Sequence, residues 1–403
     1  MDLYLQVGHG MMGHCRHLIE KWGEGTVILS PKNMTKAQIL KFSSDIKKLN
    51  GSVLIDPQFY IPRSSQHNLH KHSFWPDDFS STNAFFTGNG LDVFLRTFIE
   101  DYVLPAACSA LIVPGLLLDD EVNEDWDTIN HSIFDSLSKF NLSIPKYMTL
   151  CIGSNVFMSE DKTHALLEMV EDYPVEGFYL IPEHPSNDYL VDNVSWLFNV
   201  MDFVAGLKIK NKHIIIGYSN HQFLAFALAK ADAICAGSWL KTRMFPRGDF
   251  DIDEETSFGR KTTWYYCPQA LSEYQVPFLD IASRAGILEQ FKPSAIFGSQ
   301  YADNLFTGAQ PTTVAFNEAL AFRHYLHCLR YQCHDVSKNT YDETKTYLQL
   351  LFETASDLSD YFRSHGVRGK YREFSNVADT NLGLLDAFDS MRGLAFKTKW
   401  NEF

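Results

Sequence analysis

The stretch GSVLIDPQFY, residues 51–60, is the clearest indication of the fold, because it sets a carboxylate and an aromatic ring just after a short apolar run. The run Val53, Leu54 and Ile55 predicts a buried parallel strand, and Pro57 ends it. Asp56 therefore falls at the carboxyl end of the strand, where (β/α) barrels carry their chemistry. Asp56 is the first candidate site residue, and Tyr60 follows it at a spacing that suits a flat ligand.

Outward from this stretch, apolar strand-like runs alternate with helical patterns along the first 240 residues. We expect strands at residues 3–7, 27–31, 53–55, 110–115, 147–153, 176–182, 213–218 and 232–239. Strands that alternate with helices predict parallel pairing through helical crossovers. The predicted fold class is α/β, and eight such strands favour a closed (β/α)8 TIM barrel, with an open doubly wound sheet as the alternative.

The pattern loosens after Trp239, through a loop rich in Arg, Asp and Gly, and then becomes helical. Residues 314–332 have an amphipathic helical period that predicts a helix packed against the barrel. We therefore expect a barrel over residues 1–332 and a helical C-terminal extension over residues 333–403.

Composition limits the class of protein. The chain has 403 residues, of which 45% are hydrophobic, so it can bury one large core and carry a smaller appendage. The first residues lack the basic start and cleavage site of a signal peptide, and no apolar run reaches the ~18 residues of a membrane span. Seven cysteines without a CxxC pair indicate reduced thiols and no metal site. We expect a cytoplasmic protein that has no cofactor and no contact with a membrane.

A net charge of -14 disfavours a large nucleic-acid surface, because that affinity comes mainly from clustered Lys and Arg. The loop from Lys241 to Lys261 is the best local candidate for phosphate contacts, but acidic residues interrupt it. A solvated loop of self-neutralising charges is the favoured reading.

Small polar residues at other predicted strand ends complete the candidate site. Ser219 and Asn220 follow one strand, where they can cap the next helix or present amides to a ligand. The remaining candidates at strand ends are Gly237, Ser238, Ser154 and Asn155, for which close strand packing or turn formation is the alternative reading.

Three segments together resemble the tRNA-guanine transglycosylase superfamily, whose barrel enzymes exchange guanine for a 7-deazaguanine base. Asp56-Pro57-Gln58-Phe59-Tyr60-Ile61 is similar to the family motif Asp-Ser-Gly-Gly-Tyr/Phe-Gln. HIIIGYSNHQFLAFALAKADAICAGSWLKTR, residues 213–243, resembles a late segment that ends in Pro-Thr-Arg, and AFNEALAFRHYLHCLR, residues 315–330, resembles the helix after the zinc insert. The resemblance implies that Asp56 contacts the base and Tyr60 stacks on it, and its matches include Gln58 and Arg243.

The chain also departs from that family. The nucleophilic aspartate of the family should fall near residues 235–238, where this chain has no carboxylate, and the zinc motif is absent. Pro114 and Gly115 stand where the family has a second base-reading aspartate, which leaves Asp119 or Asp120 as substitutes. These departures resemble those of the DNA-modifying paralogues and of transglycosylase-like proteins in antiphage operons, including CBASS systems.

Three functions follow as expectations. The first is recognition of a 7-deazaguanine-type base, free or attached to a macromolecule, by a protein of an antiphage system that has a protein partner from the same operon. The second is active base exchange on DNA or tRNA, with Asp56 or a relocated acid as nucleophile, so that membership of an enzyme class stays open. The third is an unrelated barrel enzyme that binds a phosphorylated metabolite at Ser219, Asn220 and Gly237. By resemblance we also expect a homodimer.

Overall fold

The computed structural model describes residues 1–77, 82–251 and 262–403. Eight parallel strands pair in the order β3-β2-β1-β9-β8-β7-β6-β4, with a ninth short strand, β5 (Leu117–Leu118), beside β6. The strands are β1 (Asp2–Gln6), β2 (Thr26–Leu29), β3 (Ser52–Ile55), β4 (Leu111–Val113), β6 (Lys146–Ile152), β7 (Gly177–Pro182), β8 (His213–Ile216) and β9 (Ala233–Ala236). Each of the eight falls on one of the predicted apolar runs.

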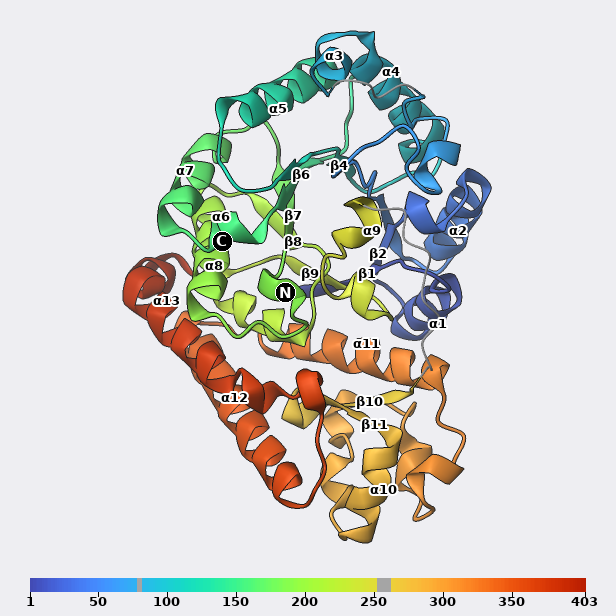
Figure 1. Cartoon of the computed structure of the whole chain (residues 1–403), viewed down its shortest axis with the longest axis vertical. Coiled ribbons are helices and arrows are strands. Elements are labelled where there is room, and N and C mark those ends of the chain that lie inside the picture. Colours follow the sequence, from blue (N-terminus) through green and yellow to red (C-terminus); the bar gives the residue numbers. More distant parts are fainter. Residues whose placement is uncertain (78–81, 252–261) are drawn as a thin grey trace.

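The sheet curls until its ends nearly meet. The first strand pairs with the last, with Leu5 opposite Ala236. Between β3 and β4 the amide of Ser109 donates to the main-chain oxygen of Val53 at 3.0 Å. The prediction of a (β/α)8 barrel is therefore confirmed, and Figure 1 shows the helices as a ring outside the strands.

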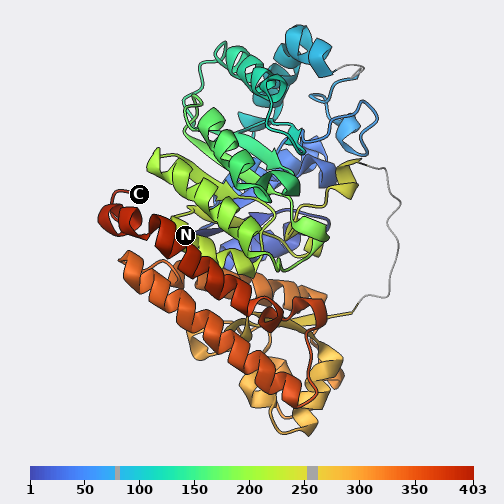
Figure 2. The same ribbon diagram turned by 60° about the vertical axis from the view of Figure 1, so that its left-hand side comes forward.

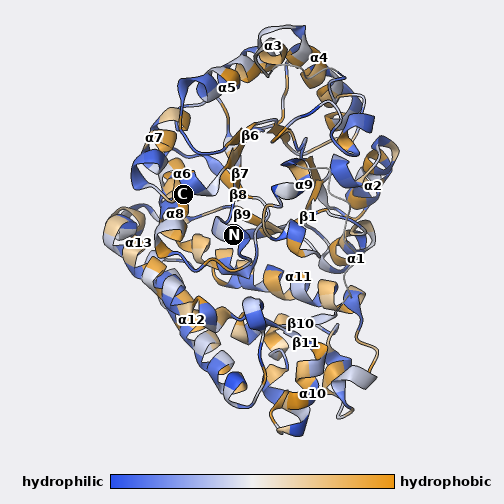
Figure 3. Ribbon diagram, viewed as in Figure 1, coloured by the Kyte–Doolittle hydropathy of each residue, from blue (hydrophilic) through white to orange (hydrophobic). Residues whose placement is uncertain are grey.

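Helices follow the strands, and several of them begin at a residue whose side chain caps the first turn. The helix α2 (Lys36–Lys48) begins with a capping box in which Thr35 accepts from the amide of Gln38 and Gln38 accepts from that of Thr35. In Figure 3 the strands are mainly hydrophobic and the helices carry both colours. The other crossover helices are α1 (Met12–Trp22), α3 (Thr82–Thr87), α4 (Asn89–Phe98), α5 (Glu124–Leu137), α6 (Ser154–Phe157), α7 (Glu160–Val170), α8 (Val194–Ile209) and the 3₁₀ helix η5 (His221–Ala229).

The eighth helix of the ring comes late in the chain. The helix α11 (Glu318–Asp335) contacts β1 and α1, and so fills the place beside the closing strands. The predicted helix at residues 314–332 is confirmed, while the predicted domain boundary at residue 332 falls inside it. The excursion before α11 contains a hairpin, β10 (Trp264–Cys267) and β11 (Ser272–Gln275), followed by α10 (Val276–Arg284).

This hairpin was not expected, because the segment was predicted to be helical. Tyr265 and Tyr274 lie opposite each other and pack into a second, smaller core with Leu279 and Phe362. Tyr266, on the opposite face of the hairpin, is buried in the main core, so burial on both faces of the two-stranded sheet overrides the local helical pattern.

Two long helices form the C-terminal extension. The helices α12 (Tyr341–Ser364) and α13 (Ala378–Lys399) run side by side in both views, and α13 packs on α8 (Figures 1 and 2). Arg392 of α13 donates to both carboxylate oxygens of Asp202 of α8, at 2.6 and 3.0 Å. None of the helices in the described part of the chain has the length and apolar character needed to cross a bilayer.

Candidate functional site

Polar side chains from several strands meet inside the barrel at the carboxyl ends of the strands. Gln6 ends β1, Ser30 follows β2, Asp56 follows β3 and Tyr179 lies on β7, and all four are buried. Parallel strands place their carboxyl ends at one edge, so residues far apart in sequence converge here. We call this group, with Gln58, Tyr60 and Tyr218, the mouth cluster.

Asp56 is the centre of the mouth cluster. Its Oδ1 accepts from the amide of Gln58 at 2.9 Å, and its Oδ2 accepts from the hydroxyl of Tyr60 and lies 3.3 Å from that of Tyr179. Burial raises the pKa of the Asp56 carboxyl to about 6, although the hydrogen bonds from Tyr60 and Gln58 oppose the rise. The carboxyl therefore changes its charge near physiological pH.

Gln58 holds the turn after β3 in an uncommon conformation. Its φ of 56° lies in the left-handed region, which non-glycine residues seldom adopt. Its Oε1 accepts from the Ser30 hydroxyl and from the Lys32 amide, both at 2.9 Å, and its Nε2 donates to Tyr218 at 3.2 Å. These contacts stabilise a strained turn that points the Asp56 carboxylate inward.

One donor of the mouth cluster has no acceptor. The Nε2 of Gln6 is buried and has no hydrogen-bond partner. The Tyr179 hydroxyl lies 3.0 Å from Gln6 Oε1 and 3.3 Å from Asp56 Oδ2, so its single proton is shared between them. An unpaired buried amide of this kind costs about 1–3 kcal/mol, which a ligand oxygen would recover.

A segment from the loop after β9 covers the cluster. We call residues 244–251 the covering segment; it includes the short helix α9 (Gly248–Asp251), which lies near the middle of the ring in Figure 1. The rings of Phe245 and Phe250 lie 5.4 and 5.0 Å from the ring of Tyr60, which is only 2% exposed. The predicted stacking ring is thus covered by the protein's own side chains in this structure.

Polar contacts at its helical end hold the covering segment in place. Arg63 and Gln66 both donate to the main-chain oxygen of Phe250, at 3.0 and 2.9 Å. The Nζ of Lys32 donates to the main-chain oxygen of Asp249 and lies 4.4 Å from the centre of the Phe250 ring. This end of the segment is therefore anchored mainly through hydrogen bonds and one cation over an aromatic ring.

Arg247 of the covering segment pairs with two carboxylates at strand ends. It lies 2.8 Å from Asp119, after β5, and 3.4 Å from Glu183, after β7. The hydrogen bond from Arg247 lowers the pKa of Asp119. Asp119, suggested as a substitute for the family's second aspartate, therefore lies at the mouth, whereas Asp120 pairs with Lys162. Glu183 is a mouth carboxylate that the sequence did not indicate.

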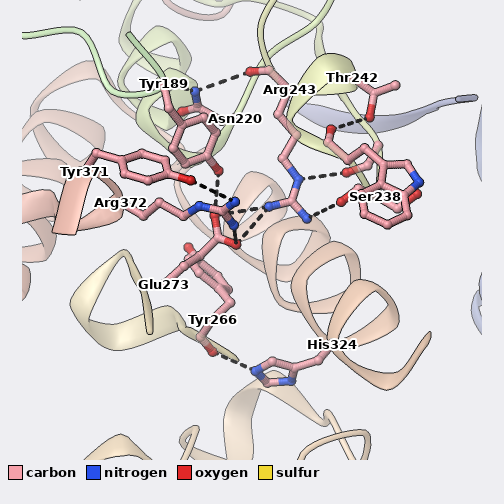
Figure 4. A network of polar contacts seen from close by, with 12 residues as sticks. Tyr189, Asn220, Ser238, Thr242, Arg243, Tyr266, Glu273, His324, Tyr371 and Arg372 are labelled. Carbon is pink, nitrogen blue, oxygen red and sulfur yellow. Dashed lines mark hydrogen bonds and ion pairs between the residues drawn. The ribbon is translucent and has the colours of Figure 1, made fainter. Parts of the chain in front are cut away.

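The other predicted residues divide into a second group of four and three residues outside it. Asn220, Gly237, Ser238 and Arg243 meet at the rim of the barrel beside the hairpin (Figure 4). Arg243 donates to the main-chain oxygens of Gly237 and Ser238, at 2.8 and 3.0 Å. Its Nη1 lies 3.1 Å from both carboxylate oxygens of Glu273.

Glu273 is the hub of this second group. Arg372, from the C-terminal extension, donates to its Oε2 at 2.9 Å, and the Tyr189 hydroxyl donates to its Oε1 at 2.8 Å. Burial alone would raise the pKa of Glu273, but Arg372 and Arg243 hold it at about 2. The arginine–glutamate group thus joins the barrel, the hairpin and the extension, and we call it the rim group.

Ser219, Ser154 and Asn155 belong to neither the mouth cluster nor the group around Arg243. The Ser219 hydroxyl donates to the main-chain oxygen of Ile216 at 2.9 Å, and the Ser154 amide lies 3.2 Å from Glu183 Oε2. Asn155 is exposed. Asn220 caps η5 by accepting from the amide of Gln222. The capping role predicted as the alternative for Asn220 is therefore present.

The described residues, which omit 78–81 and 252–261, contain no cluster of three or more His, Cys, Asp or Glu side chains able to hold a metal ion. All seven cysteines are buried as free thiols. Of the loop considered for phosphate contacts, residues 252–261 lie outside the described part, and Lys241 pairs with Asp249.

The fold and the mouth cluster define the class: a (β/α)8-barrel protein with a buried polar site at its carboxyl-terminal mouth. Comparisons with protein-family models, with curated proteins and with solved structures found no match. The resemblance to the transglycosylase superfamily therefore stays a prediction.

Proposed function

We propose that the mouth cluster binds a planar nucleobase of the 7-deazaguanine type when the covering segment moves aside. The observation that carries the proposal is the pairing of a buried acceptor with a buried, unpartnered donor. Asp56 supplies the acceptor, Gln6 Nε2 the donor, and the Tyr179 hydroxyl lies within 3.3 Å of both side chains.

This pair complements the edge of a lactam ring. A guanine-like edge offers N–H donors beside a carbonyl oxygen, so the donors would face Asp56 and the oxygen would face Gln6. Each charge-assisted hydrogen bond contributes about 1.5–3 kcal/mol, and stacking on an aromatic ring contributes about 1–3 kcal/mol. These hydrogen-bond and stacking energies are enough for the protein to recognise the base without a chemical reaction.

Access to the cluster requires Phe245 and Phe250 to leave the ring of Tyr60. The main-chain oxygen of Phe250 in α9 accepts hydrogen bonds from Arg63 and Gln66, and the buried ring of Phe250 packs on the rings of Tyr60 and Phe245. Moving the segment exchanges those contacts for water and frees the Tyr60 face for the ligand. Movement of a covering loop over a barrel mouth is a common way to admit a ligand.

Calorimetric titration with 7-deazaguanine tests the proposal. Saturable binding is expected for the wild type and tighter binding for Phe250→Ala, which no longer covers Tyr60. Asp56→Asn should remove most of the affinity, whereas Asp92→Asn, at a carboxylate that pairs with Lys139 on the outer helices, should leave it unchanged. Absence of binding to both the wild type and Phe250→Ala would refute the proposal.

A second function, base exchange on DNA or tRNA, is favoured by Glu183. Its carboxylate lies at the mouth with 8% of the residue exposed, so a second acid accompanies Asp56 there. Covalent exchange calls for a carboxylate nucleophile. Incorporation of labelled base into tRNA or DNA that is lost in Glu183→Gln would support this function, and its absence in the wild type would count against it.

The antiphage setting, the operon partner, the homodimer and the cytoplasmic location remain predictions from the sequence.

A further inference from the structure

The rim group lies beside a cavity that the proposed base site does not use. The cavity has a volume of about 320 Å³ and lies between the loop after β9, the hairpin strands and α11. This volume is near the lower end of ordinary ligand pockets, so a compact ligand would fit. Its lining includes five aromatic side chains, those of Trp239, Trp264, Tyr266, Phe322 and Tyr325.

The buried charges beside the cavity do not cancel. Arg243 and Arg372 are 2% and 9% exposed and carry two positive charges, while Glu273, at 3%, carries one negative charge. Burial lowers the pKa of His221, the nearest buried imidazole, to about 4, so that ring is neutral at pH 7. One excess positive charge is therefore held out of water, which favours an anion nearby.

Other charges around the cavity leave this excess in place. Glu373 has its own partner, Arg363, at 2.7 Å, and Lys241, which also lines the cavity, pairs with Asp249. Glu318 lines the cavity as well but is only partly buried, so water screens its charge.

Three buried polar atoms of the lining have no hydrogen-bond partner. They are the hydroxyls of Ser238 and Tyr325 and the Nε of Arg372. The arginine nitrogen can only donate, and each hydroxyl has a proton to give. An oxyanion would accept hydrogen bonds from these unpaired donors, and its negative charge would balance the excess positive charge.

The aromatic walls define the rest of the ligand. The guanidinium of Arg372 stacks 4.0 Å from the centre of the Trp264 ring, and that of Arg243 stacks 3.4 Å from Tyr325. The ring of Trp239 lies edge-on to Phe322, with centres 4.8 Å apart. A flat ring can pack against these walls while its acidic group lies at the guanidiniums.

We propose that this cavity is a second ligand site, which binds a compact phosphate ester that carries a flat heterocycle, the chemistry of a nucleoside 5′-monophosphate. The phosphate lies among Ser238, Arg243 and Arg372, and the heterocycle lies against Trp239 and Trp264. The site is separate from Asp56 and does not depend on movement of the covering segment.

Titration of the full chain with three probes tests this proposal, with tryptophan fluorescence and calorimetry as readouts. Inorganic phosphate should bind weakly, adenosine 5′-monophosphate should bind about tenfold to a hundredfold more tightly because of ring stacking, and adenosine should bind more weakly than the monophosphate. Ser238→Ala should weaken binding of both phosphate and the monophosphate. Trp264→Leu should weaken the monophosphate and leave phosphate unchanged.

Controls separate this site from the mouth cluster. Asp56→Asn should leave monophosphate affinity unchanged, and so should Trp22→Leu, at a tryptophan of α1 that lies beside His327. The proposal is overturned if neither phosphate nor the monophosphate binds the wild type at about 10 mM, a very weak limit for a specific site. Equal affinities of the wild type and Ser238→Ala for both ligands would overturn it too.

Discussion

Replacing Asp56 by Asn should change how the stability of the protein depends on pH. The pKa of the buried carboxyl rises from an ordinary value of 3.8 to about 6. The folded state therefore keeps its proton between these values while the unfolded state loses it, so stability falls as pH rises through this interval. Since one pKa unit corresponds to about 1.4 kcal/mol, the loss amounts to roughly 3 kcal/mol.

The assay is urea denaturation of the wild type and of Asp56→Asn at pH 4, 5, 6 and 7, pH values that bracket the pKa of about 6. Asn imitates the protonated carboxyl, so the two proteins should be similarly stable near pH 4. Above pH 6 the wild type should lose roughly 3 kcal/mol relative to the variant. The difference between the two proteins removes the contributions of other groups, such as Glu273, whose pKa is about 2.

A difference in unfolding free energy that stays constant from pH 4 to 7 would refute this reasoning. It would mean that Asp56 ionises as easily in the folded chain as in the unfolded one. Asp119→Asn serves as a control of opposite sign, because Arg247 lowers the pKa of that carboxyl. The stability of the wild type relative to that control should fall as the pH is lowered.

Four further substitutions test the fold by urea denaturation. Gly115→Ala would place a Cβ 2.2 Å from the main-chain oxygen of Thr149 and should lower the free energy of unfolding by at least about 2 kcal/mol. In Gly13→Ala, within α1, the new Cβ meets nothing within 4 Å, so this substitution should raise the free energy of unfolding by up to about 1 kcal/mol. Thr35→Ala removes the capping box of α2 and should cost about 1 kcal/mol, and an unchanged midpoint would show that the cap is dispensable. Arg392→Met leaves Asp202 buried without its bidentate partner and should cost roughly 2 kcal/mol, while no loss would mean that α13 docks through apolar contacts alone.

The eight strands of the barrel could be predicted from the sequence because they are short apolar runs bounded by turn residues. Val53, Leu54 and Ile55 are buried at 0–2% exposure, as the run predicts. The hairpin was missed because neither of its strands shows a clear alternation: Trp264–Cys267 is a short apolar run, and Ser272–Gln275 is mostly polar. The aromatic run Trp264-Tyr265-Tyr266, followed by the turn residues Pro-Gln-Ala-Leu, was the available signal for a hairpin.

The candidate site was predictable only in part. Asp56 and Tyr60 could be found because the strand end and the ring are close in sequence. The covering segment could not be predicted, since Phe245 and Phe250 contact Tyr60 from about 190 residues away in the sequence. Likewise Arg372 joins Glu273 across 99 positions, and no local pattern encodes such a contact.

The late arrival of the closing strand affects how the chain is synthesised. One edge of β1 pairs with β2, which follows it closely in the chain. The other edge of β1 pairs with residues 233–236, and α11 packs beside β1, so both contacts form only after those later segments have been synthesised. Throughout most of translation the nascent chain therefore exposes an unpaired strand edge, the kind of surface that recruits chaperones or joins a neighbouring nascent chain. Truncation before residue 233 should yield an aggregating fragment and not a smaller stable protein.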